Sequence, residues 1–215
     1  MPTYLEMVNE VLGRLRESAV ASVTTSVYST LIGRFVNEAK YQVESAWDWD
    51  ALSTTLTLNT VGGTSNYVLT GSGVRHKKAV VNDTTNRLTL QNYPIRRIQD
   101  QQQLSTTQNS NPSAYAWNGS NGTDSKVELW PTPAAVYALR FNLYVPQPIL
   151  VSGSTSILIP SEAVVAGAYA RAIAERGEDG GLAASEATGL YKAILSDQIA
   201  IEAARSIENN RWEAV

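Results

Sequence analysis

The sequence predicts an α+β fold in which a helical bundle carries an inserted antiparallel β-sandwich or partial barrel. Three consecutive blocks support this prediction. Residues 1–50 show helical spacing of apolar residues, residues 51–159 alternate with a period of two, and residues 160–215 return to helical spacing. Because the helical pattern resumes after the strands, we expect one discontinuous helical domain, 1–50 with 160–215, and a β domain over 51–159.

Two helices are predicted in the first block. Thr3 and Glu6 have the spacing of a capping box, and a helix follows to Leu15. A short polar break at residues 22–26 supplies the cap of a second helix, which ends at Trp47-Asp48-Trp49. Its expected buried face repeats every four residues and is widened on one side: Val27, Leu31, Phe35, Ala39, Val43, Trp47, with Tyr28, Ile32 and Val36.

The β block is predicted to contain about six strands. Residues 52–59 alternate, Gly62-Gly63 marks a turn, and residues 67–69 are expected to return as a hairpin. A second hairpin is expected from residues 80–81 and 88–90, followed by a polar surface connection over 99–112.

Three further strands follow in the same block. They are predicted at residues 114–117, 126–130 and 136–145, the first two joined by a Gly/Asn turn. In the last strand every second residue is apolar and is expected to point to the core: Tyr137, Leu139, Phe141, Leu143 and Val145.

Two helices are predicted in the third block. Pro160 suits a first helical turn, Glu162 complements the helix dipole, and an Ala-rich helix runs over residues 163–176. Glycines at 177, 180 and 181 end it. The last helix is expected from Leu182 to about Asn210, with an apolar stripe at Tyr191, Ile194, Leu195, Ile199 and Ala203.

Composition excludes several classes of protein. The 215 residues contain no Cys, which removes disulfide scaffolds, thiolate metal sites and Cys nucleophiles. The net charge of -3 gives no support for a nucleic-acid binder, although residues 51–160 carry eight Lys/Arg against four Asp/Glu and the rest nine against sixteen. We expect no signal peptide, because Glu6 and Glu10 interrupt the first apolar stretch, and no membrane span, because the uncharged runs contain Thr, Gly and Pro.

No residue pattern predicts catalysis, a cofactor or a metal. His76 is the single histidine and lies in Arg75-His76-Lys77-Lys78, which predicts a solvated strand end. Asp48 and Asp50 flank Trp49 as paired carboxylates do in some sugar-processing clefts, but at a helix-to-strand corner the favoured role is capping and turn formation. Phosphate-binding loops and serine-nucleophile motifs are absent from the sequence, so no enzymatic activity is expected.

Basic and aromatic residues of the β block suggest partner contacts. Candidates are Arg75, Lys77, Lys78, Arg96 and Arg97, which would meet an acidic protein surface or phosphates unless they are solvated strand ends. Trp117, Trp130 and several tyrosines leave open a carbohydrate- or receptor-binding module. At the other end of the chain, Arg211 and Trp212 follow the last apolar stripe, either as a partner anchor or as a frayed terminus.

The chain resembles bacteriophage head-to-tail adaptor (connector, or head completion) proteins. The resemblance is carried by the helical pair that closes on Trp47 and Trp49 and by four further stretches: Asn111-Pro112-Ser113-Ala114-Tyr115, Val127-Glu128-Leu129-Trp130-Pro131-Thr132-Pro133, Leu139–Tyr144, and Ile157–Ile159 with Pro160-Ser161-Glu162 leading into an Ala-rich helix that ends in Glu175–Asp179. It is weakest over residues 60–110. These are positions of apolar residues, Pro and Gly without a catalytic signature.

The resemblance implies a structural virion protein rather than an enzyme. Such proteins form a twelve-subunit ring beneath the portal, extend the double-stranded DNA channel and present a docking surface for a tail hub, nozzle or tail-completion protein. The implied location is the head–tail interface of the virion, and the host cytoplasm during assembly. Arg205, Arg211 and Trp212 are then candidate portal contacts, and the basic residues of the β block are candidate contacts with other partners.

Overall fold

The structure is a computed structural model that describes residues 1–104, 108–177 and 181–205, except for the side chain of Lys78. It forms two compact units. One, the helical unit, comprises residues 1–51 and 147–215, and the other, the β unit, comprises residues 52–146. The helical unit therefore includes residues 147–159, which the sequence patterns group with the strands. The predicted α+β fold with an inserted sheet is confirmed.

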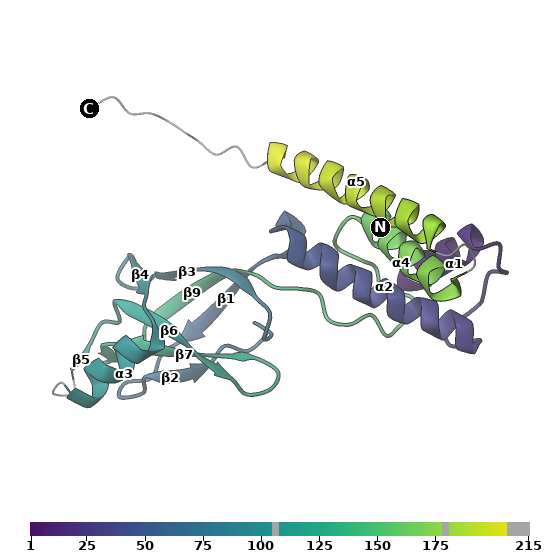
Figure 1. Ribbon diagram of the computed structural model, residues 1–215. Coiled ribbons are helices and arrows are strands. Elements are labelled where there is room, and N and C mark those ends of the chain that lie inside the picture. The colour runs from purple at the N-terminus through teal and green to yellow at the C-terminus, as the bar shows by residue number, and fades with distance from the viewer. Residues whose placement is uncertain (105–107, 178–180, 206–215) are drawn as a thin grey trace, which may run out of the picture. The chain divides into compact units, whose positions relative to one another are not determined.

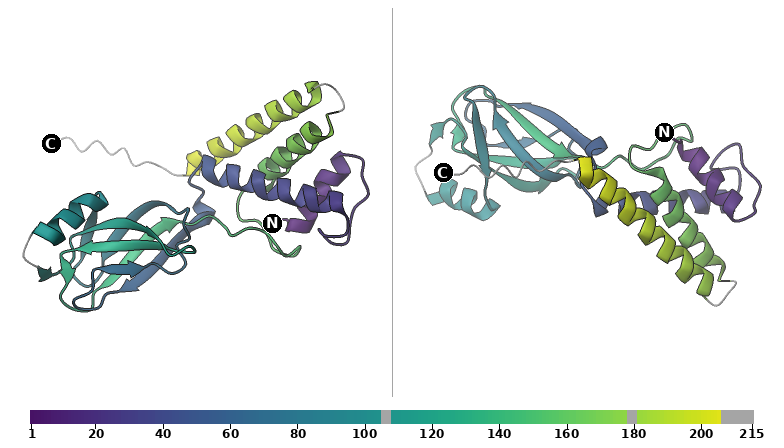
Figure 2. Two further views of the ribbon diagram at one scale, coloured as in Figure 1. Left: turned by 60° about the horizontal axis from the view of Figure 1, so that its bottom comes forward. Right: turned by 90° about the horizontal axis from the view of Figure 1, so that it is seen from above.

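Four helices build the helical unit (Figure 1): α1 (Tyr4–Arg14), α2 (Val27–Ala46), α4 (Ser161–Arg176) and α5 (Leu182–Arg205). The predicted capping box at Thr3 is confirmed, with the Glu6 carboxylate accepting from the Thr3 N–H at 2.7 Å. Hydrogen bonding to Thr3 lowers the pKa of Glu6. Helix α4 packs against α1, α2 and α5, and Figure 2 shows it between α2 and α5. Its alanines and Gly167 permit this close packing: a Cβ on Gly167 would lie 3.1 Å from Tyr191.

The buried face of α2 differs from the predicted apolar stripe. Val27 is 90% exposed, whereas Asn37, Lys40 and Glu44 are buried. These three polar side chains hold residues 147–150, the segment that returns from the β unit. Asn37 donates to the Leu150 carbonyl at 3.1 Å and accepts from its N–H at 2.8 Å. A buried polar side chain is stable when its hydrogen bonds are satisfied, and here the partners are distant in sequence, so spacing alone could not predict the burial.

Lys40 and Glu44 form a buried ion pair beside this segment. The Lys40 Nζ lies 3.0 Å from Glu44 Oε1, and their side chains are 0% and 1% exposed. Lys40 also donates to the Gln147 carbonyl, and the Gln147 N–H donates to Glu44 Oε1 at 3.0 Å. The pair thus provides hydrogen-bond partners for both the backbone N–H and the carbonyl of Gln147, and these bonds add to the attraction that stabilises the two buried charges.

The β unit is a curled, half-barrel sheet of seven strands in the order β1-β9-β3-β4-β6-β7-β2 (Figure 1). Its strands are β1 (Ser53–Asn59), β2 (Asn66–Val68), β3 (Lys77–Asp83), β4 (Leu88–Asn92), β6 (Ala114–Ser120), β7 (Ser125–Trp130) and β9 (Ala138–Tyr144). A second sheet pairs β5 (Asn109–Ser110) with β8 (Thr132–Pro133). The partial barrel is as predicted, but β4 and β6 run parallel.

The predicted hairpin at Gly62-Gly63 is wrong. Strand β1 pairs with β9, and β2 pairs with β7 at the opposite end of the sheet order. The loop between β1 and β2 packs closely on the chain before β9: a Cβ on Gly62 would lie 2.9 Å from the Ala134 carbonyl, and the Gly63 N–H donates to Pro133 at 2.8 Å. The glycines therefore permit a close backbone approach rather than a hairpin turn.

The expected β3–β4 and β6–β7 pairs are confirmed, as is the inward face of β9. The connection predicted over residues 99–112 is partly wrong, because α3 (Ile95–Leu104) forms there and packs against β6 and β7. Ile98 is fully buried and anchors this otherwise polar helix. The apolar residues of α3 are few and only Ile98 is buried, so the polar, Gln-rich composition made a surface connection the expected structure.

Candidate functional site

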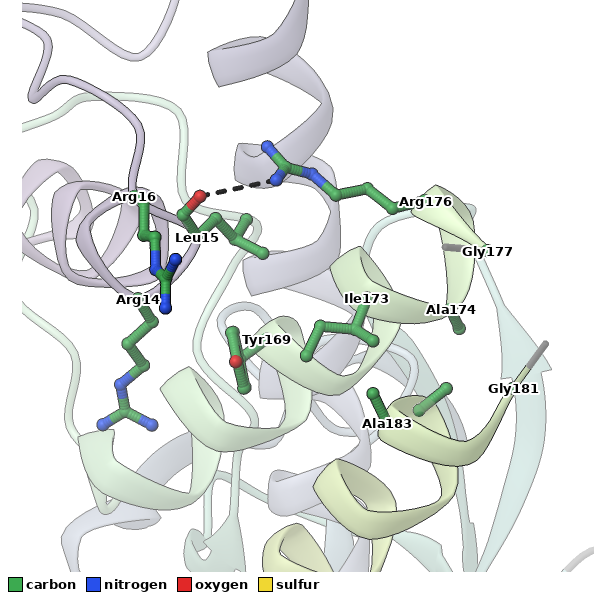
Figure 3. A pocket seen from close by; sticks show the side chains of 11 residues that line it. Arg14, Leu15, Arg16, Tyr169, Ile173, Ala174, Arg176, Gly177, Gly181 and Ala183 are labelled. Carbon is green, nitrogen blue, oxygen red and sulfur yellow. Dashed lines mark hydrogen bonds between the residues drawn. The ribbon is translucent and has the colours of Figure 1, made fainter. Parts of the chain in front are cut away.

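A pocket of about 530 Å³ opens in the helical unit where the C-terminal ends of α1 and α4 meet the start of α5 (Figure 3). We call it the arginine pocket. Among the described residues that line it, three carry guanidinium groups and none carries a carboxylate. The remaining lining is small or apolar: Leu15, Tyr169, Ile173, Ala174, Gly177, Gly181, Ala183 and Ala184. Positive charge beside apolar surface suits a ligand that offers a carboxylate next to a hydrophobic group.

Two of the three arginines are held by neighbouring carboxylates. Arg14 lies 2.7 Å from Glu10, one turn away on α1. Arg176 lies 2.5 Å from Glu17 and donates to the Tyr28 hydroxyl at 2.9 Å. The hydrogen bond to Tyr28 is the main reason why the pKa of Arg176 is raised, so this guanidinium remains charged at every physiological pH.

Arg16 differs from the other two. No carboxylate among the described residues lies within ion-pair distance of its exposed side chain. Its φ is +60°, a left-handed conformation that glycine usually supplies at this position after a helix. The backbone hydrogen bonds are those of a Schellman helix end: the Arg16 N–H donates to the Gly13 carbonyl at 3.0 Å and the Glu17 N–H to the Leu12 carbonyl at 2.9 Å. An arginine here costs about 1 kcal/mol relative to glycine, and local strain of this kind is often associated with a functional side chain.

Helix α5 presents a second apolar face. It packs on α4 through Ala187 and Tyr191, which are buried. Beside this buried face, about 90° around the helix axis from it, Glu186, Leu190, Asp197 and Ile201 fall within about 60° of one another. We call these four residues, together with the small residues between them, the α5 stripe. Leu190 is 54% and Ile201 52% exposed, so this face combines exposed aliphatic side chains with two carboxylates.

The predicted apolar stripe of the last helix is only partly correct. Tyr191 is buried, whereas Ile194, Leu195, Ile199 and Ala203 are half-buried. The reason is that α5 packs mainly on one neighbour, α4, and a single neighbour cannot cover so wide a face.

The basic residues of the β unit lie on separate elements. Arg75 and Lys77 precede and begin β3, while Arg96 and Arg97 are exposed on α3. Arg97 stacks over the Tyr93 ring at 3.8 Å, as a cation–π contact. The structure does not describe the side chain of Lys78. The two clusters therefore offer charge at two places rather than one continuous basic groove.

His76 is half-buried, and its prediction as a solvated strand end is wrong. Its ring lies 4.1 Å from the Trp117 ring, and its Nδ1 is 3.2 Å from the Ser125 hydroxyl. Burial lowers the pKa of His76. Ser125 is itself buried and its hydroxyl also lies 2.9 Å from the Gly73 carbonyl. The sequence did not suggest this Ser–His contact; its geometry closes the loop before β3 onto β7 instead of exposing a nucleophile.

The tryptophans considered for carbohydrate binding are not open platforms. Trp117 packs against His76, Tyr115 and Phe141, with ring distances of 4.1 to 6.2 Å. Trp130 is half-buried. Stacking on a sugar requires an exposed aromatic face, and at Trp117 these ring contacts compete for it.

Asp48 and Asp50, the paired carboxylates of the sequence, follow α2 at the corner between the helix and strand β1. Asp50 begins a short 3₁₀ turn, η1 (Asp50–Leu52), and its N–H donates to Glu202 at 2.9 Å. Trp49 between them is 1% exposed and donates to the Val43 carbonyl at 2.7 Å. Over the described residues, no group of His, Cys, Asp or Glu side chains is arranged to hold a metal ion. In the same part of the chain, no helix has both the length and the apolar character needed to span a membrane.

Of the candidate portal contacts, the structure describes Arg205 alone. Its exposed guanidinium lies 3.2 Å from the buried Glu202 at the last described turn of α5. Arg211 and Trp212 lie outside the described residues. Their expected role therefore stays a prediction.

Comparison with known proteins gives a family for this two-unit architecture. The family model described as SU10 adaptor protein matches residues 2–213. The chain belongs to the SU10 adaptor protein family. A search of curated proteins finds no match.

Membership confirms the resemblance to phage head–tail adaptors. The SU10 adaptor protein family is one of virion adaptors, which are generally structural rather than enzymatic. The match spans both units, so the β unit is part of the family architecture. Sequence reasoning missed Arg14, Arg16 and Arg176 as a group, because the three lie on different helices or loops. An arginine at the C′ position of a predicted helix, where glycine is usual, was the available signal.

Proposed function

We propose that this protein is a subunit of a ring, of twelve copies as in the proteins that it resembles, that joins the portal of a phage head to the tail. In this role it extends the channel through which double-stranded DNA passes and offers a surface on which a tail hub, nozzle or tail-completion protein docks. The family match over residues 2–213 carries the proposal, because it covers the helical unit and the β unit together.

The net negative charge of the helical unit suits the wall of a channel through which DNA moves. Outside residues 51–160 the chain has sixteen Asp/Glu against nine Lys/Arg. Fixed Lys and Arg contacts to phosphates slow DNA movement because each contact releases counterions and adds affinity. An acidic wall repels phosphates, so packaged DNA passes without adhering. The mature protein would act in the virion at the head–tail interface, after assembly in the host cytoplasm.

The contacts with neighbours are assigned to opposite parts of the chain. We assign the portal contact to the end of the last helix and the residues after it, Arg205, Arg211 and Trp212. We assign tail or neighbour contacts to Arg75, Lys77, Lys78, Arg96 and Arg97 of the β unit. An Arg–Trp pair is the composition of many interface hot spots, and exposed arginines such as Arg96 favour an acidic protein surface.

The test is to mix the purified protein with the portal protein of the same phage and image the product by electron microscopy. A second ring stacked coaxially on the portal supports the proposal, and a bare portal at excess protein contradicts it. The matched variants are Arg211→Ala/Trp212→Ala and Arg96→Ala/Arg97→Ala. The first pair is expected to lose portal binding and the second to keep it, while the second loses binding of the tail protein. The reverse result would refute the assignment of the two ends.

A further inference from the structure

We propose that the arginine pocket of one copy receives the α5 stripe of a second copy, so that adjacent subunits meet through a head-to-tail contact. The inference deepens the proposed ring and rests on it, since it names the two faces that meet. Both faces belong to the helical unit, and among the described residues the side chains of Arg16 in the pocket and of Glu186 and Asp197 in the stripe make no ion pair within that unit.

The pocket provides one half of the contact. Figure 3 shows Arg14 and Arg16 beside Tyr169 and Ile173, so guanidinium groups border apolar side chains. Arg16 is the group that the fold least requires: its side chain has no carboxylate partner among the described residues, and its backbone conformation favours glycine. Binding of a carboxylate from another molecule would explain why an arginine, which weakens the fold here and has no internal carboxylate partner, stands at this position.

The α5 stripe provides the other half. It repeats a carboxylate followed four residues later by an aliphatic side chain, first Glu186 with Leu190 and then Asp197 with Ile201. At this spacing the two members of each pair are neighbours on the helix surface. Neither carboxylate has a side-chain hydrogen bond or ion pair among the described residues, and all four residues are exposed. Each pair therefore presents the carboxylate and the hydrophobic group that the arginine pocket can bind together.

Charge complementarity selects a second copy as the occupant. The helical part of the chain is acidic as a whole, yet the charged side chains among the described residues that line this pocket are all arginines. Two different faces that bind each other form a heterologous contact, and repetition of such a contact closes a ring when the rotation permits it. An isologous dimer of two α5 stripes would instead place Glu186 and Asp197 of both copies together, where like charges repel.

The absence of cysteine from the sequence allows a direct test by cross-linking. Ala174→Cys labels the pocket and Ala193→Cys labels the α5 stripe, and both side chains are exposed and uncharged. Lys192→Cys is the matched control, exposed on the same helix but turned about 140° from Ala187 and away from the stripe. The two labelled proteins, of different mass, are mixed with a short bismaleimide, alone and in the presence of the portal.

We expect the pocket–stripe product to exceed the pocket–control product at least tenfold. Asp197→Arg in the stripe partner is expected to reduce it about tenfold, and Arg16→Glu in the pocket partner to restore it. Arg16→Gly is expected to lose the product with a Tm no lower than that of the parent, which separates a binding role from a folding role.

Each outcome supports or overturns the contact between the arginine pocket and the α5 stripe. A ring on the portal with equal pocket–stripe and pocket–control yields overturns the inference and leaves the adaptor function standing. A cross-link between two stripe cysteines that dominates the products also overturns it, in favour of an isologous contact. No ring and no product rejects both the contact and the proposed function. The specific product without a ring supports the contact and rejects portal docking.

Discussion

Replacement of Glu44 by glutamine tests how strongly the returning chain is fixed to α2. Glutamine keeps the shape and can still accept from the Gln147 N–H, but it removes the Glu44 charge 3.0 Å from the Lys40 ammonium, in a site where the lysine side chain is 0% exposed. Breaking a buried ion pair at one partner costs about 3–5 kcal/mol. The folding equilibrium should therefore shift by a factor of about one hundred to several thousand.

The control is Glu10→Gln, which removes the carboxylate from an ion pair of similar length. Arg14 and Glu10 are 37% and 51% exposed, and such surface pairs contribute about 0.3–0.5 kcal/mol. Urea unfolding followed by the circular dichroism of the helices gives the free energy of each variant, and hydrogen exchange at Gln147 and Leu150 reports the local effect. A loss below about 1 kcal/mol for Glu44→Gln, or one equal to the control, would refute the reasoning.

Three further predictions concern other sites. Gly33→Ala places a Cβ inside side chains of the adjoining segments and should cost about 1–3 kcal/mol, whereas Gly13→Ala, with open space around it, should be neutral or stabilising by thermal unfolding. Burial lowers the pKa of His76 below 6.5, so the folded β unit favours the neutral ring; its Tm should fall as the pH drops below about 6.5, and a His76→Gln variant that shows the same fall would contradict this. Ile98→Ala should cost about 2–5 kcal/mol and release α3, with the exposed Leu104→Ala as control; equal urea midpoints would refute the anchor.

The fold class could be predicted because the spacing of apolar residues changes from one block of the chain to the next, and this spacing can be read without knowledge of tertiary contacts. The capping box at Thr3, the period-two face of β9 and the helix after Pro160 are local patterns, and all three are present. Strand pairing between segments far apart in the chain could not be predicted from such local patterns. Strand β1 pairs with β9 across most of the β unit, and no local pattern distinguishes that partner from β2.

The burial of polar residues was the least predictable feature. Asn37, Lys40 and Glu44 look like surface positions of an amphipathic helix, and only the arrival of residues 147–150 makes them interior. The arginine pocket has the same origin, because it brings Arg14 and Arg16 at the end of α1 together with Arg176 at the distant end of α4. What the sequence could show of the site was the position of Arg16 just after α1, since glycine is the usual residue there.

The pairing of β1 with β9 determines how the β unit would respond to mechanical load. The chain enters this unit at Leu52 and leaves it after Pro146, and the first and last strands are adjacent there: Ser53 pairs with Tyr144, and the Val145 N–H donates to the Leu52 carbonyl at 2.9 Å. Tension applied through the two connections therefore pulls neighbouring strands apart from one end, so the ladder bonds carry the force one after another rather than all at once. The β unit should yield at low force by unzipping of β1 from β9, and the connections, not the sheet, would set how much extension the protein tolerates.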